Sequence, residues 1–206
     1  MIGVKNRTFA TTNIQVLPGD DRFRYYLMSI DGLVMLPPEI PTSQHSQSQL
    51  RKANRRNVTN TMPDTTSNAP PPTMLGTIVA GSENEEYILD SGTTLSFIPH
   101  NLAQRYNSMF DPPAAIDSYS GFYVIPCNAA VPFLGVKIGG TTFWHNPKDL
   151  VKQFDPSGRS CVSGIQSANT LGGPNILGDV FLNNVLAVFD LGEKQLSFAA
   201  RTDYES

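Results

Sequence analysis

Residues able to do chemistry gather at positions 87–95, which read Tyr-Ile-Leu-Asp-Ser-Gly-Thr-Thr-Leu. An apolar run delivers Asp90, and the hydroxyls of Ser91 and Thr93 can hydrogen-bond its carboxylate. Gly92 permits a tight turn and the close approach of a substrate or another backbone. The segment thus presents an ionisable group in a fixed orientation, as acid–base chemistry requires. Asp-Ser-Gly is also ordinary turn chemistry, so both interpretations stay open on this segment alone.

A second segment far downstream adds to the first. It reads Asn-Ile-Leu-Gly-Asp-Val-Phe-Leu at residues 175–182. The apolar pair Ile176 and Leu177 can pass beside the strand that carries Asp90, with Gly178 allowing close packing. The alternative is an ordinary buried strand followed by a turn.

The elements that must position these residues are mostly strands. Two strands at 25–30 and 33–36 flank the turn dipeptide Asp31-Gly32, which would join them as a hairpin. Further strands are expected at 75–80, 86–89, 121–126 and 133–138, with a hairpin turn at 139–140, and a final hairpin pairs 185–189 with 195–199. A short helix is expected at 99–106, and a second begins at Asn146-Pro147 and runs to about residue 154.

Composition changes sharply at residues 37–74, a tract rich in Pro, Ser, Gln, Asn and Thr with almost no large apolar residues. Such a segment cannot offset its ordering entropy by burial, so we predict a long, exposed and disordered loop. Arg51, Lys52, Arg55 and Arg56 make it locally basic. They form either a solvated loop or a processing or docking site.

The overall composition excludes several classes of function. The formal net charge is -3, so no basic field exists to hold nucleic acid. No apolar run approaches the roughly 20 residues of a membrane span. The three histidines are scattered and the two cysteines do not form a CxxC site, which argues against a zinc enzyme. Residues 1–12 lack a signal-peptide core, so the protein is either cytosolic or begins upstream.

Taken together, these motifs resemble the C-terminal lobe of the pepsin-like aspartic proteases. The match comprises D-[ST]-G-[ST]-[ST] at residues 90–94, the hydrophobic-hydrophobic-Gly element at 176–178, a suitably spaced cysteine pair and the closing hairpin. The form of the Asp90 segment looks most like fungal secreted and yapsin-type members. The resemblance implies a mainly β, pepsin-like acid protease lobe with short helices, the C-terminal half of a two-lobed fold.

The same resemblance divides the chain. Residues 1–36 would be the opening strands, 37–74 a disordered insertion, 75–201 the remainder of the lobe and 202–206 a tail. Secretion, or a vacuolar or cell-surface location, is implied by the family alone. The family cleaves peptide or protein substrates at acidic pH without a metal or cofactor, because its nucleophile is a water polarised by two carboxylates.

Residue roles follow from the resemblance position by position. Asp90 would be the catalytic aspartate, with Thr93 bonded to its outer oxygen and Ser91 gripping the matching loop of the other lobe. The substrate-binding positions would be Gly92 and Thr94, with Ile88 and Tyr25 toward the primed side. The supporting loop would be Ile176, Leu177 and Gly178. Cys127 and Cys161 would form the lobe's disulfide, the alternative being two buried free thiols.

One part of the family pattern is absent from this sequence. Aspartic proteases need two carboxylates whose proximity separates their pKa values, and no first D-[ST]-G or flap tyrosine occurs here. We expect the chain to be the C-terminal part of a longer protease, inactive by itself. The other interpretations are a non-catalytic single-lobe binding or relic protein, a homodimer in which two copies of Asp90 meet, and an unrelated β-sandwich binding domain.

Overall fold

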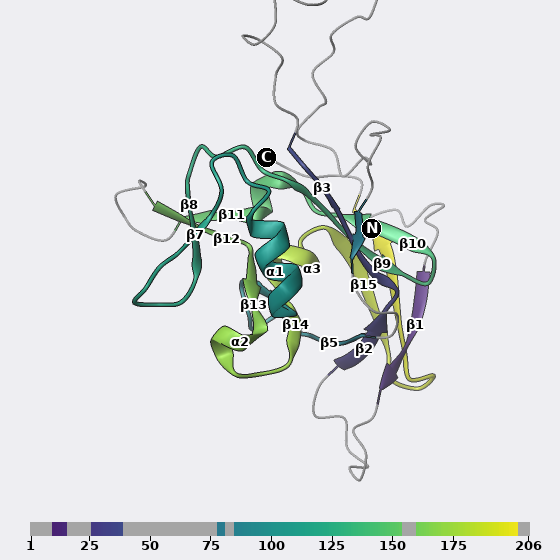
Figure 1. Cartoon of the computed structure of the whole chain (residues 1–206). Helices are drawn as coiled ribbons and strands as arrows, with labels where there is room; N and C mark the ends of the chain where they lie inside the picture. The colour runs from purple at the N-terminus through teal and green to yellow at the C-terminus, as the bar shows by residue number, and fades with distance from the viewer. Residues whose placement is uncertain (1–9, 16–25, 39–77, 81–84, 154–159, 202–206) are drawn as a thin grey trace, which may run out of the picture.

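A computed structural model describes residues 10–15, 26–38, 78–80, 85–153 and 160–201. Within these residues the strands form one sheet of eight strands and two of four. Figure 1 shows helices α1 and α3 in the middle of the view, with β7, β8, β11 and β12 on one side and β1 and β15 on the other. No helix in this part of the chain has the length and apolar character needed to cross a membrane.

The eight-stranded sheet brings together strands from both ends of the sequence. In spatial order its strands are β13 (Ile165–Ser167), β6 (Ser96–Ile98), β14 (Asn175–Leu177), β5 (Glu85–Leu89), β2 (Tyr26–Ile30), β1 (Ala10–Gln15), β16 (Gln195–Ala200) and β15 (Val185–Asp190). The strands before the proline-rich tract therefore pair with strands that follow it, since β2 pairs with β5 and β1 with β16.

Two smaller sheets and short helices complete the described fold. One sheet has the order β10 (Thr141–Trp144), β9 (Phe133–Ile138), β3 (Gly32–Leu36), β4 (Ile78–Ala80). The other has the order β11 (Val151–Gln153), β12 (Ser160–Ser163), β8 (Tyr123–Pro126), β7 (Ala115–Ile116). The helices are α1 (His100–Asn107), the 3-10 helix η1 (Pro147–Leu150), α2 (Ala168–Leu171) and α3 (Asp179–Leu182).

Several predicted elements are confirmed. Helix α1 begins one residue after Pro99 and buries Leu102, Ala103 and Tyr106. Strand β9 has the predicted bounds and pairs with β10 across the Gly139-Gly140 turn. The final hairpin also forms, with β15 and β16 paired antiparallel from Val185 opposite Ala200 to Asp190 opposite Gln195.

The predicted hairpin at Asp31-Gly32 is wrong, because its two strands do not pair with each other. Both flanking strands exist, but β2 pairs with β1 and β5, whereas β3 pairs with β4 and β9. The chain crosses from one sheet to another at Asp31, whose amide donates to the Lys137 carbonyl and whose carboxylate accepts the Gly140 amide. Every residue of β3 is buried, and a continuous apolar run of this kind indicates a strand covered on both faces rather than half of a hairpin.

The second predicted helix is correct at its start and too long at its end. The Asn146 side chain caps η1 by accepting the Lys148 amide, and Pro147 occupies the first position. The helix stops at Leu150 because Val151–Gln153 pairs with β12 as strand β11. A β-branched residue at position 151 and an available partner strand outweigh the local helical pattern.

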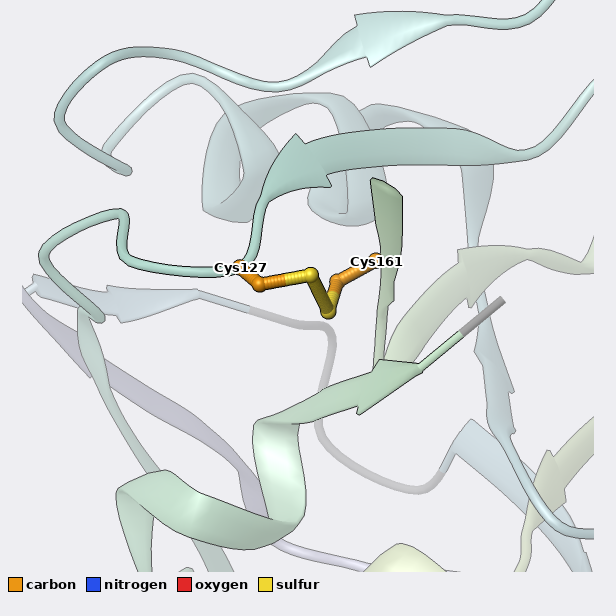
Figure 2. Close-up of a disulfide and its surroundings, with 2 residues drawn as sticks. All are labelled: Cys127 and Cys161. Carbon is orange, nitrogen blue, oxygen red and sulfur yellow. A yellow bond between two sulfur atoms is a disulfide. The ribbon is translucent and has the colours of Figure 1, made fainter. Parts of the chain in front are cut away.

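The predicted disulfide is present between Cys127 and Cys161. The sulfur atoms lie 2.09 Å apart and the Cα atoms 5.0 Å apart, across a separation of 34 residues. Cys127 directly follows β8 and Cys161 lies in β12, so the bridge joins two strands that are already paired (Figure 2). The bond therefore fixes one end of the four-stranded sheet that contains β11 and β7.

Some predictions fall outside the described residues. They include the disorder of the 37–74 tract beyond Pro38, its four basic residues, Tyr25 and the tail at 202–206. Strand β4 falls within the predicted 75–80 strand, of which residues 78–80 are described. Strands β12 and β13 and helix α2 were not predicted, because the segment Cys-Val-Ser-Gly-Ile-Gln-Ser is short and only weakly patterned.

Candidate active site

The Asp90 loop begins where β5 ends, and β14 lies directly beside that strand. The two strands run parallel, with Ile176 opposite Ile88 and Leu177 opposite Leu89. The Asp90 amide donates to the Leu177 carbonyl at 3.0 Å, which extends the ladder to Asp90 itself. The apolar pair in the downstream segment therefore positions the base of the loop, as the sequence predicted.

The Asp90 carboxylate is held at both oxygens. Thr93 Oγ1 donates to Oδ2 at 2.6 Å, and the Gly92 amide donates to Oδ1 at 2.9 Å. The second bond thus comes from a backbone amide, where the sequence suggested the hydroxyl of Ser91. Both bonds stabilise the charged form, so they hold the pKa of the Asp90 carboxyl below its usual value, the Thr93 bond being the larger cause and partial burial opposing it.

Gly178 and the start of α3 pack against the backbone of the Asp90 loop and donate hydrogen bonds to it. The Asp179 amide donates to the Thr93 carbonyl at 2.8 Å, and the Val180 amide donates to the Thr94 carbonyl at 3.1 Å. These donors are helix N-terminal amides that have no partner within their own helix. A Cβ at Gly178 would clash with the carbonyl oxygens of Thr93 and Leu95, so the close packing requires glycine at this position.

Ser96 is a supporting residue that the sequence analysis missed. It is fully buried, and its hydroxyl accepts the Gly178 amide at 3.1 Å while its own amide donates to the Gly164 carbonyl. The bond links β6 to the turn between β14 and α3. A serine within the apolar run Leu-Ser-Phe-Ile was the available signal, because a buried hydroxyl needs a partner.

The other predicted site residues differ in their exposure. Ser91, Gly92 and Thr94 are exposed at the tip of the loop, while Ile88 is half-buried in β5. Tyr25 lies outside the described residues. The loop therefore offers one oriented, accessible carboxylate bordered by hydroxyl groups and backbone amides. In the described part of the chain no group of three or more His, Cys, Asp and Glu side chains is arranged to hold a metal ion.

Comparison with solved structures defines the class of fold. The crystal structure of an aspartic proteinase from Irpex lacteus matches with a TM-score of 0.55 and 17% sequence identity. The match covers 96% of this chain and 48% of that chain. The fold is therefore pepsin-like, mainly β with a few short helices, and the fold class predicted from the sequence is confirmed.

Comparison of sequences identifies the family. The profile described as eukaryotic aspartyl protease matches residues 72–201. A probable aspartic-type endopeptidase of Aspergillus fumigatus is 46% identical over 119 residues, which are 56% of this chain and 27% of that protein. Penicillopepsin-1 of Talaromyces stipitatus is 38% identical over 121 residues, 59% of this chain and 30% of that protein. The chain belongs to the eukaryotic aspartyl protease family, and its resemblance to fungal members is confirmed.

The matches cover only part of the length of the related proteins. Across the curated relatives, the matched part of the chain spans between 22% and 34% of their own length. The Irpex lacteus proteinase is covered over about half of its chain. A function that needs the whole length of those proteins is therefore a proposal for this chain.

Proposed function

We propose that the chain is the C-terminal lobe of an aspartic endopeptidase and that Asp90 is one of its two catalytic aspartates. The observation that carries this proposal is the Asp90 loop, whose carboxylate accepts bonds from Thr93 and Gly92 and remains accessible. The family match over residues 72–201 includes this loop together with its support at residues 176–178. Under this proposal, residues 1–36 and 75–201 build the lobe around the 37–74 insertion.

The chemistry requires a second carboxylate close to Asp90. Two such groups share one proton, because their like charges separate their pKa values. The ionised carboxylate takes a proton from water, and the protonated one donates to the scissile carbonyl. Hydrogen bonds from Thr93 and Gly92 favour the charged form of Asp90, which suits it to the ionised role. No step in this scheme needs a metal or a cofactor.

The remaining site residues take positions around that pair. Gly92 and Thr94 line the peptide-binding cleft, and Ser91 reaches across to the matching loop of the other lobe. Ile88 and Tyr25 are assigned to binding on the primed side of the substrate. The proposed partners are a peptide or protein substrate and a missing N-terminal lobe, and secretion or a vacuolar location is proposed from the fungal relatives.

A second candidate is a non-catalytic binding protein or a homodimer of this lobe. Strand β15 favours these alternatives, because Leu186, Val188 and Phe189 are exposed on it. Exposed apolar side chains on an edge strand favour association with a partner surface. In a homodimer the two copies of Asp90 would supply the pair.

The test compares two substitutions in the protein encoded by the complete transcript. Asp90→Asn should reduce peptide cleavage by at least about a thousandfold, because a group that takes part in the chemistry is lost. Asp117→Asn is the matched control, since Asp117 also accepts a serine hydroxyl and an amide within an exposed loop, yet should keep full activity. Cleavage retained in the Asp90 variant would rule out the proposal. A transcript that encodes no Asp-Thr-Gly or Asp-Ser-Gly loop besides the one at Asp90 would favour the single-lobe candidates.

A further inference from the structure

The Asp90 loop depends on α3 for its position, but α3 is a single turn. Its first two amides are directed to Thr93 and Thr94, so any movement of the helix moves the loop. Within α3 itself, the amides of Phe181 and Leu182 donate to the Gly178 carbonyl. So short a helix is marginal alone and must be fixed by the structure around it.

Asn184 holds the other end of this helix. It is almost fully buried, and its Nδ2 donates back to the Val180 carbonyl at 2.8 Å. Its Oδ1 accepts the Asn146 amide at 2.7 Å, which ties α3 to the start of η1. Both backbone groups of Val180 are therefore hydrogen-bonded: its amide donates to the Thr94 carbonyl, and its carbonyl accepts from Asn184 Nδ2.

The same Nδ2 also donates to a buried carboxylate. Asp149 in η1 is only 4% exposed, and its Oδ2 accepts from Asn184 at 2.9 Å. Its Oδ1 lies 3.4 Å from both Lys152 Nζ and Asn183 Nδ2. Burying a carboxylate is costly unless its bonds compensate, and bonds to a charged group are stronger than neutral ones. A charged acceptor therefore fixes the Asn184 amide more firmly than a neutral one would.

We propose that Asp149 and Asn184 are a positioning pair for the Asp90 loop and act on it through Val180. The link runs from the Asp149 carboxylate to the Asn184 amide, then to the Val180 carbonyl, and from the Val180 amide to Thr94. Neither residue touches the reacting groups. The catalytic meaning of the pair rests on the proposed function, but the mechanical link can be measured without substrate.

The test is amide hydrogen exchange in the full 206-residue chain. In Asn184→Ala, we expect the amides of Asp179 and Val180 to exchange at least about tenfold faster relative to the amides of β9, because local opening raises exchange only where support is lost. Asp149→Val should act in the same way, since it removes the acceptor and leaves Asn184 in place. The carboxyl carbon of Asp90 should also titrate at a higher pH in both variants, because Thr93 is held less firmly.

Two further variants separate positioning from general stability. Tyr106→Phe removes the buried hydrogen bond that Tyr106 in α1 donates to the Pro132 carbonyl, so it should raise exchange evenly or not at all. Asp149→Asn keeps an acceptor for Asn184, so exchange at Asp179 and Val180 should rise only two- to fivefold relative to β9. This variant tests the positioning role even if the other variants fail to fold. Exchange at Asp179 and Val180 that changes in step with β9 in the Asn184 and Asp149 variants would overturn the proposal, whatever the activity of Asp90→Asn.

Discussion

At the scale of single residues, the Thr93 hydroxyl is the main support of the charged Asp90 carboxylate. Thr93→Val keeps the shape of the side chain and removes the donor, so we expect the pKa of Asp90 to rise toward its ordinary value. Carboxyl-carbon NMR titration measures this directly. Ser91→Ala is the control and should leave the titration unchanged, because the Gly92 amide bonds the other oxygen. An unchanged titration in Thr93→Val would show that the bond does not control this group.

A second residue, His145, is buried in the fold and has a lowered pKa. Burial lowers the pKa of His145 from 6.5 to about 4, against the opposing effects of the Leu134 carbonyl and Asp149. Its Nδ1 lies 3.0 Å from the Leu134 carbonyl, and its Nε2 has no hydrogen-bond partner among the described residues. The unfolded chain therefore takes up a proton more readily than the folded chain between these two pKa values.

We expect the free energy of unfolding to fall as the pH drops from 6.5 to about 4, by on the order of 3 kcal/mol from this residue. His145→Gln keeps a donor for the Leu134 carbonyl but does not titrate, so its urea-unfolding curves should lack this part of the pH dependence. The exposed His100 provides the control variant His100→Gln, which should behave as the wild type does. An equal slope in His145→Gln would assign the acid sensitivity to other groups.

At the scale of elements, the sequence predicts well where local pattern and tertiary context agree. Helix α1 was predicted where its apolar residues match the face that it buries, and the final hairpin where two apolar runs flank the turn residues 190–193. The strand at Val151 and the crossing at Asp31 were not predicted, because each depends on pairing with another strand: β12 for Val151 and β9 for Asp31. Turn chemistry at Asp31-Gly32 indicates a change of direction, and it cannot specify which sheet receives the chain.

The disulfide covalently constrains the β8–β12 pair. It closes a separation of 34 residues, and the chain-entropy account gives about 4 kcal/mol for a loop of that size. We expect the double variant Cys127→Ala and Cys161→Ala to lower the free energy of unfolding by roughly this amount, measured by urea denaturation. Reduction of the wild-type chain with dithiothreitol should reproduce the loss and should leave the double variant unaffected. Equal stability of oxidised wild type and double variant would contradict this expectation.

At the scale of the whole molecule, the candidate site divides into parts that sequence could and could not reveal. The Asp90 loop and the 176–178 element form continuous motifs, so the sequence alone brought them together. Ser96 is a single polar residue within an apolar run, whereas Asn184 follows Asn183 and Asp149 lies in the polar stretch Asn-Pro-Lys-Asp. None of these local patterns marks a support for the loop, because the contacts form only where β6, α3 and η1 meet. The spacing of Ser96, Asp149 and Asn184 in the sequence carries no repeating signal, since the fold alone sets the distances between them.

Strand β15, at one end of the eight-stranded sheet, carries exposed apolar side chains. Leu186 and Val188 share one face of β15, and they are 36% and 43% exposed. Among the described residues, β15 pairs with β16 on one side and with no strand on the other. Exposed apolar groups on an open edge strand favour association, so we expect the isolated chain to self-associate at micromolar concentration in sedimentation-velocity experiments.

Leu186→Lys together with Val188→Lys should restore a monomer, because charges on an edge strand oppose pairing. The control is Ile116→Lys with Tyr119→Lys, which places the same charges on apolar residues that are exposed near β7 and should leave association unchanged. We expect neither the wild type nor these variants to cleave peptides at acidic pH, because association through β15 does not supply a matching second lobe. The contrary result would be cleavage by the wild type that is lost both in Asp90→Asn and in the β15 variant. That result would show that two copies of the lobe complete the carboxylate pair, and that the homodimer is the functional form.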